Sequence, residues 1–356
     1  MSAELCIEDR PIGDDHPTFI IAEVGVNHNG DPDTAHRMVD MVADAGADCV
    51  KFQTFRAEEF CNAPEDVYEY VSQGETRRES MLEMFRRLEL KHDEFRGLFE
   101  HARARGLVPL STPTDRAAAD LLMELGAGAF KIGSDDLVHT PLLDHVGAKG
   151  RPVLISTGMA HLGDVERAVD RLHAAGSGPL AILHCISLYP TPDDGVHLRR
   201  LATLRHAFPE CVVGFSDHSW GITAALGAVA LGARVIEKHV TLDNDMPGPD
   251  HRFSANPAQL KDLVQGVRTL EAQLGSSAFR LSPAEQEMAQ LCHRAIYAAR
   301  DLPAGHVLSS DDLTYQRPGN GLPPYETDRL LGRRLSRAVP SNKAITFEHL
   351  ESVDDH

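Results

Sequence analysis

The sequence predicts a (β/α)8 barrel, the TIM-barrel architecture, followed by a smaller domain of mixed, mostly β character. Two observations predict the barrel. Eight short apolar segments recur along the first part of the chain, and amphipathic segments with helical periodicity separate them. Strands that are apolar along their whole length and alternate with helices are typical of a parallel sheet covered on both faces. Eight such units over about 260 residues fit a closed barrel.

The predicted strands repeat one pattern of strand, polar loop and helix. Helical segments include residues 33–45 and 163–175, and Gly46 and Gly176 directly follow them, as is common where helices end. The connection from residue 56 to residue 107 is longer than the others, so we expect an extra, lid-like element there. The predicted strands are Phe19–Val24, Cys49–Phe55, Leu107–Thr112, Ala129–Ser134, Pro152–Thr157, Leu180–Cys185, Val212–Asp217 and Val235–Val240.

This pattern ends near residue 275. We assign residues 1–280 to the barrel, residues 281–292 to a linker that includes a short helix, and residues 293–356 to a second domain. Short apolar runs separated by Gly, Pro, Asn and Ser fill the last part of the chain, which indicates short strands and turns.

The charge of the chain disfavours some classes of partner. Its formal net charge is −18, which argues against nucleic acid and anionic membrane surfaces. No apolar run approaches the length that spans a bilayer, and the acidic N-terminal segment lacks the features of a signal peptide. We therefore expect a cytoplasmic protein. The six cysteines are scattered and form no Cys-x-x-Cys pair, so we expect buried, reduced thiols.

Two histidines stand at the ends of the last two predicted strands. Side chains alternate along a strand, so Ser216 shares a face with His218, and Glu237 shares a face with His239. If these strands are neighbours, both imidazoles meet at one end of the barrel, where they could hold a divalent metal and leave positions for water or substrate. A histidine pair in a sequence is usually not a metal site, so the metal interpretation depends on the other strand ends.

The strand ends are also rich in lysine and hydroxyl groups. The chain has seven lysines, and we count two of them, Lys51 and Lys131, within predicted strands. Each could form a core ion pair with a carboxylate such as Glu23. We favour a small anion held by both charges and by several donors, because barrels often bind phosphate at this end. The hydroxyl groups that end or follow five of the strands belong to Ser111, Thr112, Ser134, Ser156, Thr157, Ser187 and Ser216.

The candidate site therefore combines an anion site, a metal site and an inward carboxylate, Glu23. A phosphorylated small acid as one substrate, and a carbonyl compound polarised by the metal as the other, would use all three.

The motifs of the chain, taken in order, resemble those of one family. They are FIIAEVGVNHNGD, ADCVKFQTF, LSTPTD, AFKIGSDD, LISTGM, ILHCISLYPTP, GFSDHSWGI, VALGARVIEKHVTLD, MPGPDH and QRPGNG. From Phe19 to its end the chain closely resembles the sialic acid synthase family, the N-acetylneuraminate synthases and their legionaminic, pseudaminic and spore-coat relatives. The C-terminal segment resembles the antifreeze-protein-like (SAF) domain of that family.

The resemblance implies a transferase that condenses phosphoenolpyruvate with the open-chain aldehyde of an N-acylated hexosamine, such as N-acetylmannosamine. The products would be a nine-carbon 2-keto acid and phosphate, released by cleavage of a C–O bond. A divalent cation, Mn2+ or Mg2+, is implied as a Lewis acid, with His218 and His239 as its protein ligands. Glu23 would activate water as a general base, and we class it as catalytic together with Lys51 and Lys131. The positions that match phosphoenolpyruvate binding are Lys51, Thr112, Lys131, Ser134, Ser156, Ser187 and Ser216.

The resemblance also implies how the sugar binds and how the chain assembles. Gln53, Asp136, Tyr189 and Asp250 match positions that hold the sugar. Arg317 matches an arginine that one subunit inserts into the site of the other, which implies a homodimer with exchanged domains. A fixed positive charge from the partner would complete each site.

Two departures from the family pattern concern the sugar. Asp135 and Asp136 stand where Gly-Glu is usual, and Ile186 and Ser187 stand where threonine and asparagine or serine are common. The shorter carboxylate of Asp136 could change how the sugar hydroxyls are held. The residues of the metal and anion sites are intact, so the departures leave the identity of the sugar open.

Three other interpretations stay open. A related synthase could make legionaminic or pseudaminic acid, or could act on the sugar 6-phosphate. From another enzyme class, Lys131 could be the nucleophile of a Schiff-base aldolase, which needs no metal. A non-catalytic glycan binder is the third, although a binding scaffold has no evident need for two lysines and two histidines at its strand ends.

Overall fold

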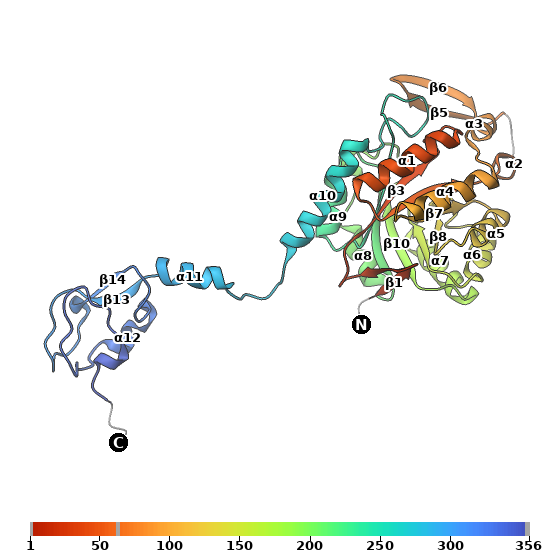
Figure 1. Ribbon diagram of the computed structural model, residues 1–356. Coiled ribbons are helices and arrows are strands. Elements are labelled where there is room, and N and C mark those ends of the chain that lie inside the picture. Colours follow the sequence, from red (N-terminus) through yellow and green to blue (C-terminus); the bar gives the residue numbers. More distant parts are fainter. Residues whose placement is uncertain (1–2, 62–64, 353–356) are drawn as a thin grey trace. The chain divides into compact units, whose positions relative to one another are not determined.

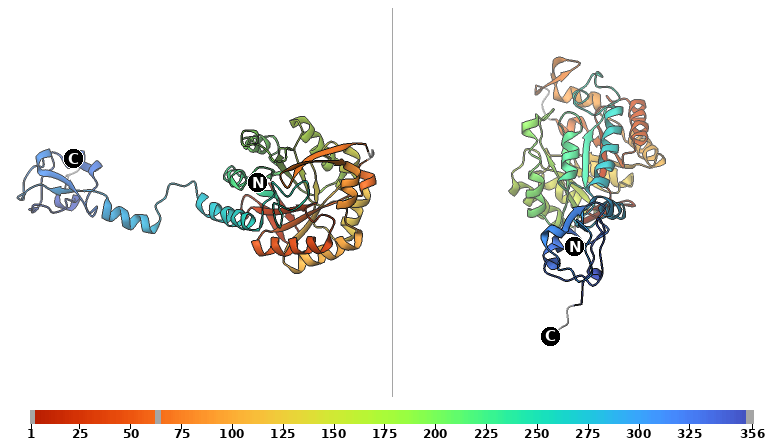
Figure 2. Two further views of the ribbon diagram at one scale, coloured as in Figure 1. Left: turned by 90° about the horizontal axis from the view of Figure 1, so that it is seen from above. Right: turned by 90° about the vertical axis from the view of Figure 1, so that its left-hand side faces the viewer.

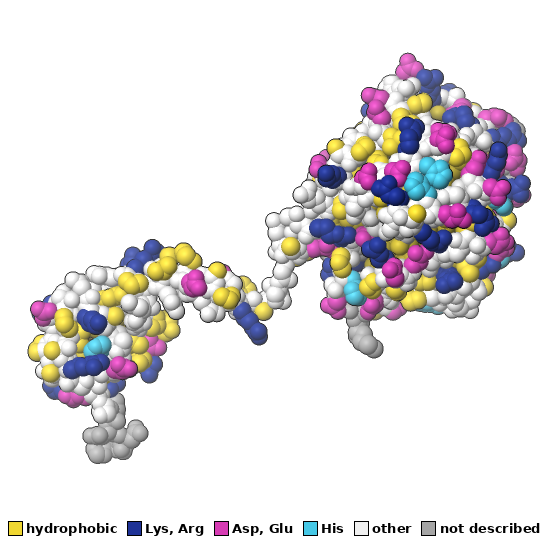
Figure 3. All heavy atoms as spheres, viewed as in Figure 1, with side chains coloured by type: hydrophobic (Ala, Val, Ile, Leu, Met, Phe, Trp, Pro, Cys, Tyr) yellow, Lys and Arg dark blue, Asp and Glu magenta, His cyan; other side chains and the backbone are white. Residues whose placement is uncertain are grey.

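The computed structural model describes residues 3–61 and 65–352, and the chain divides into two compact units, Met1–Gly275 and Ser276–His356 (Figure 1). No helix in these described ranges is both long and apolar enough to cross a membrane. Acidic and basic side chains are interspersed over the face of the first unit that Figure 3 shows.

The first unit is a (β/α)8 barrel, as predicted. Its parallel strands hydrogen-bond in the order β7-β4-β3-β12-β11-β10-β9-β8, and the two end strands, β7 and β8, also contact each other, so the barrel is nearly closed. Each of the eight predicted strands is present. In chain order they are β3 (Phe19–Gly25), β4 (Cys49–Thr54), β7 (Val108–Pro113), β8 (Phe130–Ile132), β9 (Val153–Ser156), β10 (Leu180–Cys185), β11 (Val212–Asp217) and β12 (Val235–His239).

Helices surround the strands, as the view from above in Figure 2 shows. The local sequence sets their ends. The first helix, α1, starts after Asp31, whose carboxylate accepts a hydrogen bond from the N–H of Thr34, and it ends at Gly46, which has a left-handed φ of 80°. The helices of this layer are α1 (Pro32–Ala45), α4 (His92–Ala104), α5 (Arg116–Glu124), α6 (Thr140–Gly147), α7 (Leu162–Ala175), α8 (Arg200–Ala207), α9 (Thr223–Ala230) and α10 (Pro257–Leu274), with a short 3-10 turn, η1 (Asp193–Gly195), before α8.

The amino-terminal half of the barrel interior is apolar. An antiparallel hairpin of β1 (Glu4–Ile7) and β2 (Arg10–Gly13), which the sequence did not lead us to expect, packs Leu5, Ile7 and Ile12 against the inward side chains of the strands. Those inward side chains are Phe19, Ile21, Cys49, Val108, Leu110, Ala129, Leu154, Ala181, Leu183, Val212 and Val235. This packing leaves polar inward side chains at the opposite, carboxyl end of the strands.

The long connection after β4 does carry an extra element. It contains α2 (Ala57–Phe60), a hairpin of β5 (Val67–Ser72) and β6 (Glu75–Ser80), and α3 (Met81–Leu88). The hairpin contacts the loop after β12. The hydroxyl of Ser72 accepts a hydrogen bond of 3.0 Å from the N–H of Gly248, and the amide of Gln73 donates one of 3.0 Å to the carbonyl of Asp245. The element is therefore tied to the loop that follows the strand of His239.

The second unit has short strands and turns around its own small core, in agreement with the predicted mixed character. Strands β13 (Ala295–Ala298) and β14 (Leu313–Gln316) pair antiparallel, and isolated bridges join other segments. Most of the predicted linker is helical, in α11 (Pro283–Cys292). The remaining elements are α12 (Thr327–Leu330) and the 3-10 turns η2 (Ser310–Asp312), η3 (Pro324–Glu326) and η4 (Phe347–His349).

One buried carboxylate organises the polar contacts of this small unit. The side chain of Asp312 is fully buried, and its two oxygens accept hydrogen bonds from Arg300 (2.6 Å), from the ring of His306 (2.8 Å), and from the backbone and hydroxyl of Ser309 (2.9 and 2.7 Å). Burial alone would raise the pKa of Asp312, but the hydrogen bonds outweigh it and hold this pKa well below its ordinary value.

We expect Asp312→Asn to destabilise the second unit by about 1–3 kcal/mol at neutral pH, because the amide cannot accept all of these bonds. The carboxylate stabilises the folded unit above its unfolded pKa of about 4, and that stabilisation is lost as pH falls through the depressed folded value. The difference in stability of the second unit between wild type and variant should therefore shrink below about pH 4. Hydrogen exchange of the intact protein, followed segment by segment, measures it, and an equal difference at pH 3 and pH 7 would contradict the expectation.

Candidate active site at the carboxyl ends of the barrel strands

The alternation of side chains along the barrel strands brings one polar set together at their carboxyl ends. Strand pairing places Glu23 opposite Lys51, Gln53 opposite Thr112, and Ser216 opposite Glu237. All of these except Gln53 are buried. The inward set, including residues just past the strand ends, is Glu23, Lys51, Gln53, Thr112, Lys131, Ser156, Ser216, His218, Glu237 and His239.

Four charged side chains lie at the centre of this set. The ammonium of Lys51 contacts the carboxylate of Glu23, lies 3.6 Å from that of Glu237, and donates to the hydroxyl of Thr112 at 3.1 Å. The ammonium of Lys131 lies 3.5 Å from the other oxygen of Glu237. The core ion pairs that we weighed as the alternative to an anion site are thus present, and Glu237 is a second partner that we did not assign.

The two carboxylates have pKa values shifted in opposite directions. Burial raises the pKa of Glu23 to about 7, although the attraction of Lys51 partly opposes this. Burial would also raise the pKa of Glu237, but Lys131 and Lys51 outweigh it and hold this pKa well below its ordinary value. Near neutral pH Glu237 is therefore a fixed anion, whereas Glu23 can gain or lose a proton.

Several hydroxyl groups beside the lysines have unused hydrogen-bonding capacity. Within the described ranges, the hydroxyls of Ser156 and Ser187 are buried and have no hydrogen-bond partner. The hydroxyl of Ser134 accepts a bond from the N–H of Gly158. A Cβ atom at Gly158 would lie 2.1 Å from the hydroxyl of Ser187 and 2.7 Å from that of Ser134, so only glycine leaves these hydroxyls room to converge. Two cations beside unpartnered donors are suited to binding a small anion.

The two histidines lie side by side, as the strand order requires. Their ring centroids are 5.3 Å apart, and the ring of Tyr189 packs 4.2 Å from that of His218. Nδ1 of His218 lies 2.8 Å from the carbonyl of Ile186, which fixes the ring and leaves Nε2 for another partner. Nδ1 of His239 is buried without a hydrogen-bond partner among the described residues and lies 3.8 Å from the carboxylate of Asp250.

This donor set fits a divalent cation. Burial, together with the neighbouring His218, lowers the pKa of His239 well below its ordinary value, so its ring is neutral, the form that binds metals. Burial would lower the pKa of His218 too, but Cys185 and the carbonyl of Ile186 raise it overall. In residues 3–61 and 65–352 no three His, Cys, Asp or Glu side chains are grouped so as to hold a metal. A cation here would therefore have the two imidazoles as its protein ligands and would keep positions for water or substrate.

The predicted sugar-binding residues are divided between the two units. Gln53 donates to Glu23 at 3.3 Å, and Tyr189 and Asp250 lie beside the histidines. Burial raises the pKa of Asp250 to about 6. Burial, reinforced by the nearby Asp135 and Asp115, raises that of Asp136 to about 7. Arg317 is exposed on the second unit, directly after β14.

Sequence reasoning missed two functional candidates on β12. Glu237 shares a face with His239, which was a usable signal, but its contact with both lysines depends on the closure of the barrel. Lys238 is a third lysine within a strand, so our count of two was wrong. Its side chain points away from the barrel interior.

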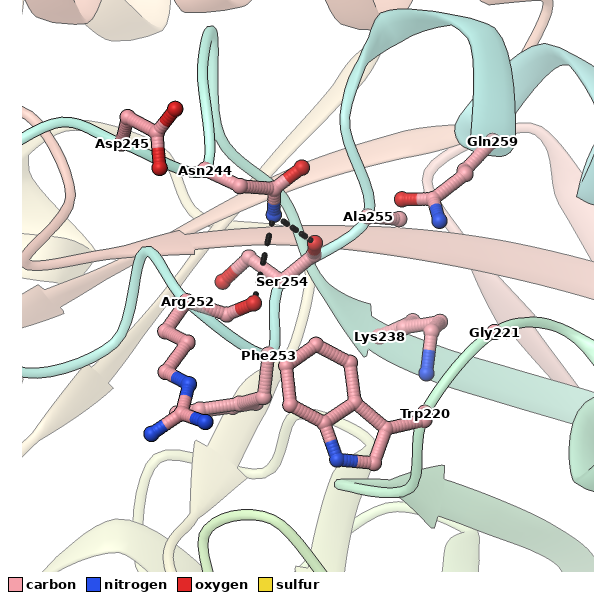
Figure 4. Close-up of a pocket in the computed structure, with 10 residues that line it drawn as sticks. All are labelled: Trp220, Gly221, Lys238, Asn244, Asp245, Arg252, Phe253, Ser254, Ala255 and Gln259. Carbon is pink, nitrogen blue, oxygen red and sulfur yellow. Dashed lines mark hydrogen bonds between the residues drawn. The ribbon is translucent and has the colours of Figure 1, made fainter. Parts of the chain in front are cut away.

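A surface pocket of about 290 Å³ lies outside the barrel next to this site (Figure 4). Trp220 and Gly221 after β11, and Asn244, Arg252 and Phe253 after β12, line it together with Lys238. Lys238 faces the opposite side of the strand from Glu237 and His239, and Phe253, whose ring centroid lies 5.4 Å from that of His239, borders both the pocket and the inward set.

The chain resembles known proteins over nearly its whole length. Residues 38–278 match the NeuB family, and residues 293–351 match the SAF domain. N,N'-diacetyllegionaminic acid synthase of Legionella pneumophila is 39% identical over 347 residues, 96% of this chain and 97% of that protein. Human N-acetylneuraminate-9-phosphate synthase is 36% identical over 360 residues, 100% of this chain and 98% of that protein. The structure of an N-acetylneuraminic acid synthetase from Leptospira borgpetersenii, in complex with citrate, superposes with a TM-score of 0.73 at 34% identity, over 81% of this chain and 95% of that one.

The buried charge cluster generates a prediction about stability. Lys131→Met leaves Glu237 with one cation instead of two, so we expect a loss of about 3–5 kcal/mol in the free energy of unfolding of the barrel. Urea denaturation of the substrate-free protein measures it. Lys149→Met is the matched control: Lys149 pairs with Asp120 at the surface, and its loss should cost less than about 1 kcal/mol. Equal effects of the two substitutions would contradict the expectation.

Proposed function

Because this chain belongs to the NeuB family of sialic-acid-type synthases, we propose that it condenses phosphoenolpyruvate with the aldehyde of an N-acylated hexosamine. The products are a nine-carbon 2-keto acid and phosphate. The observation that supports this most directly is that one end of the barrel holds two buried lysines, the hydroxyls of Ser156 and Ser187, which have no hydrogen-bond partner among the described residues, and two adjacent imidazoles. The lysines and hydroxyls suit the phosphate and carboxylate of phosphoenolpyruvate, and the imidazoles suit a carbonyl substrate.

In this proposal Lys51, Lys131 and the surrounding hydroxyls hold the phosphate and carboxylate. C3 of the enol forms a bond to the aldehyde carbon, whose oxygen takes up a proton and becomes a hydroxyl, and water adds to C2, which has become electron-poor. Glu23 takes the proton from that water, and its raised pKa suits a general base near neutral pH. The C2–O bond to phosphate then breaks, phosphate leaves with the bonding electrons, and C2 becomes the ketone as its new hydroxyl loses its remaining proton. Of the two protons of the water, one thus balances the proton taken up by the aldehyde oxygen and the other leaves with phosphate. A Mn2+ or Mg2+ ion held by His218 and His239 would supply Lewis-acid polarisation of the aldehyde oxygen.

Two of the residues assigned to the sugar, Asp136 and Asp250, are acidic, which favours an uncharged sugar over its 6-phosphate. Asp135 and Asp115 lie close enough to Asp136 to raise its pKa. A phosphate near these carboxylates would be repelled. The name of the Legionella relative indicates two acylamino groups in its product, and that of the human relative indicates a phosphate. The number of acylamino groups on the sugar and the presence of a phosphate therefore distinguish the candidate substrates.

The direct test is phosphate release from phosphoenolpyruvate with a panel of hexosamines that carry one or two acylamino groups, with and without a 6-phosphate. We expect turnover with an uncharged sugar, loss of turnover after chelation of metal, and recovery with Mn2+. Mass spectrometry identifies the product. Full activity without metal, together with a covalent adduct at Lys131 after borohydride treatment, would instead support an aldolase.

Isotope labelling tests the bond that breaks. In labelled water, the new oxygen should appear in the keto acid and not in the phosphate. We expect Glu23→Gln to bind phosphoenolpyruvate normally and to lose about 10²–10⁴-fold in turnover, because the amide cannot accept a proton. Glu271→Gln, at the opposite end of the barrel beside Thr18 and Arg268, is the control and should keep its activity. Label in the phosphate would indicate ordinary hydrolysis at phosphorus.

We also propose that the active form is a homodimer in which Arg317 reaches the sugar in the partner's barrel. The loop that carries Arg317 is well anchored within its own unit. The hydroxyl of Tyr297 lies 2.8 Å from the carbonyl of Pro318 and 2.8 Å from Oδ1 of Asn320. Such anchoring would present the exposed arginine as a fixed charge.

Mixing two inactive variants tests this arrangement. If Arg317 acts in the partner subunit, a dimer of one His218→Ala subunit and one Arg317→Ala subunit has one site with both defects and one with neither. Activity should then return, up to half the wild-type level per mixed dimer. If Arg317 acts within its own subunit, every site keeps one defect. Proven subunit exchange without recovered activity would therefore overturn the crossed arrangement.

A further inference from the structure

A buried ion pair lies on the outer face of the two strands that carry the histidines. The ammonium of Lys238 lies 2.9 Å from the carboxylate of Asp217, and both side chains are almost fully buried. These residues are direct partners in the last paired position between β11 and β12. Each is a neighbour in sequence of a proposed metal ligand, because Asp217 precedes His218 and Lys238 precedes His239.

The same pair fixes the turn around His218. The other oxygen of Asp217 accepts hydrogen bonds from the N–H and the hydroxyl of Ser219, at 2.8 and 2.7 Å. Lys238 also donates to the carbonyl of Ser219 at 2.9 Å. Both backbone polar groups of Ser219 are thus held from the outer face. The backbone of His218 lies between two fixed residues, and its carbonyl accepts a further bond from the N–H of Thr191.

Along the two strands the pair follows apolar residues. Val213, Phe215 and Ile236, the outward side chains that precede it on the two strands, belong to the hydrophobic core between strands and helices. A pair of aliphatic residues would fill this position without the cost of removing two charges from water. What an aliphatic pair cannot supply is directional bonding to Ser219. Figure 4 shows the ammonium of Lys238 on the side of the Trp220–Gly221 segment that continues this turn.

We propose that Lys238 and Asp217 are positioning residues that set the spacing of His218 and His239 for metal binding. This inference rests on the proposed function, because it takes the two imidazoles as metal ligands. On the inner face the two strands are joined by the hydrogen bond from Ser216 to Glu237, and on the outer face by the ion pair. Together these contacts fix β11 relative to β12, and therefore the backbone of His218 relative to that of His239. Groups that orient metal ligands in this way contribute strongly to affinity.

The experiment measures Mn2+ affinity directly, in full-length protein without substrate, from the electron paramagnetic resonance signal of free Mn2+. Wild type should bind and His218→Ala should not. We expect Lys238→Met and Asp217→Asn each to weaken binding by about 10-fold or more. Arg268→Met is the matched control. It breaks a partly buried ion pair of the barrel, to Asp48 at 2.8 Å at the opposite end of the strands, and should lower the unfolding temperature without changing Mn2+ affinity.

The double variant Asp217→Asn/Lys238→Met separates positioning from stability. It leaves no unpaired charge, so its unfolding temperature should recover relative to the single variants. Its Mn2+ affinity should stay low, because no donor replaces Lys238 at the carbonyl of Ser219. Wild-type affinity in Lys238→Met, or affinity that returns together with stability in the double variant, would overturn the inference. Absence of Mn2+ binding in wild type itself would overturn the metal proposal and this inference with it.

Discussion

The need to pair buried charge governs the centre of this barrel. Lys51 and Lys131 stand within parallel strands, where an unpaired ammonium would be very costly, and Glu23 and Glu237 neutralise them. Four charges that sum to zero can be buried without a ligand. Among the described residues the hydroxyls of Ser156 and Ser187 have no hydrogen-bond partner, so the charges are balanced internally while these hydrogen bonds are not. That imbalance is what one expects of a site that accepts an anion with many acceptor oxygens.

The arrangement follows from one geometric rule applied to eight strands. Because side chains alternate, the strands supply apolar inward residues near their starts, and all of them except β10 supply one or two polar inward residues at or just past their ends. The N-terminal hairpin covers the apolar end, so all inward polarity is confined to the carboxyl end. The same alternation turns Asp217 and Lys238 outward, where they contact the turn of His218 without entering the site. The inner face of these two strands thus carries the site residues, and the outer face carries residues that hold the turn of His218.

Local patterns were sufficient to predict the strands, the barrel and the meeting of the two histidines, because these depend on periodicity and strand order alone. The hairpin of β1 and β2 was missed because its strands are only four residues long and show no clear alternation of polar and apolar residues, in an acidic segment. The contacts of Glu237 with Lys51 and Lys131 join strands that lie far apart in the sequence and meet only through the closed barrel. The hydrogen bonds of Asp312 come from Arg300 and His306, which lie in turns. Turns have no periodic pattern from which these contacts could be predicted.

The pairing of Glu23 with Lys51 couples anion binding to proton affinity. In the substrate-free protein the attraction of Lys51 opposes the effect of burial on the pKa of Glu23. An anion that draws Lys51 toward itself removes part of this attraction and adds a nearby negative charge. Both changes raise the proton affinity of Glu23 further. Glu237, which is held by two lysines and by Ser216, stays ionised and keeps the net charge of the cluster low. Anion binding and protonation of Glu23 are therefore coupled: the bound anion makes Glu23 a stronger proton acceptor but lowers the fraction of it that is ionised, and only the ionised fraction can deprotonate water.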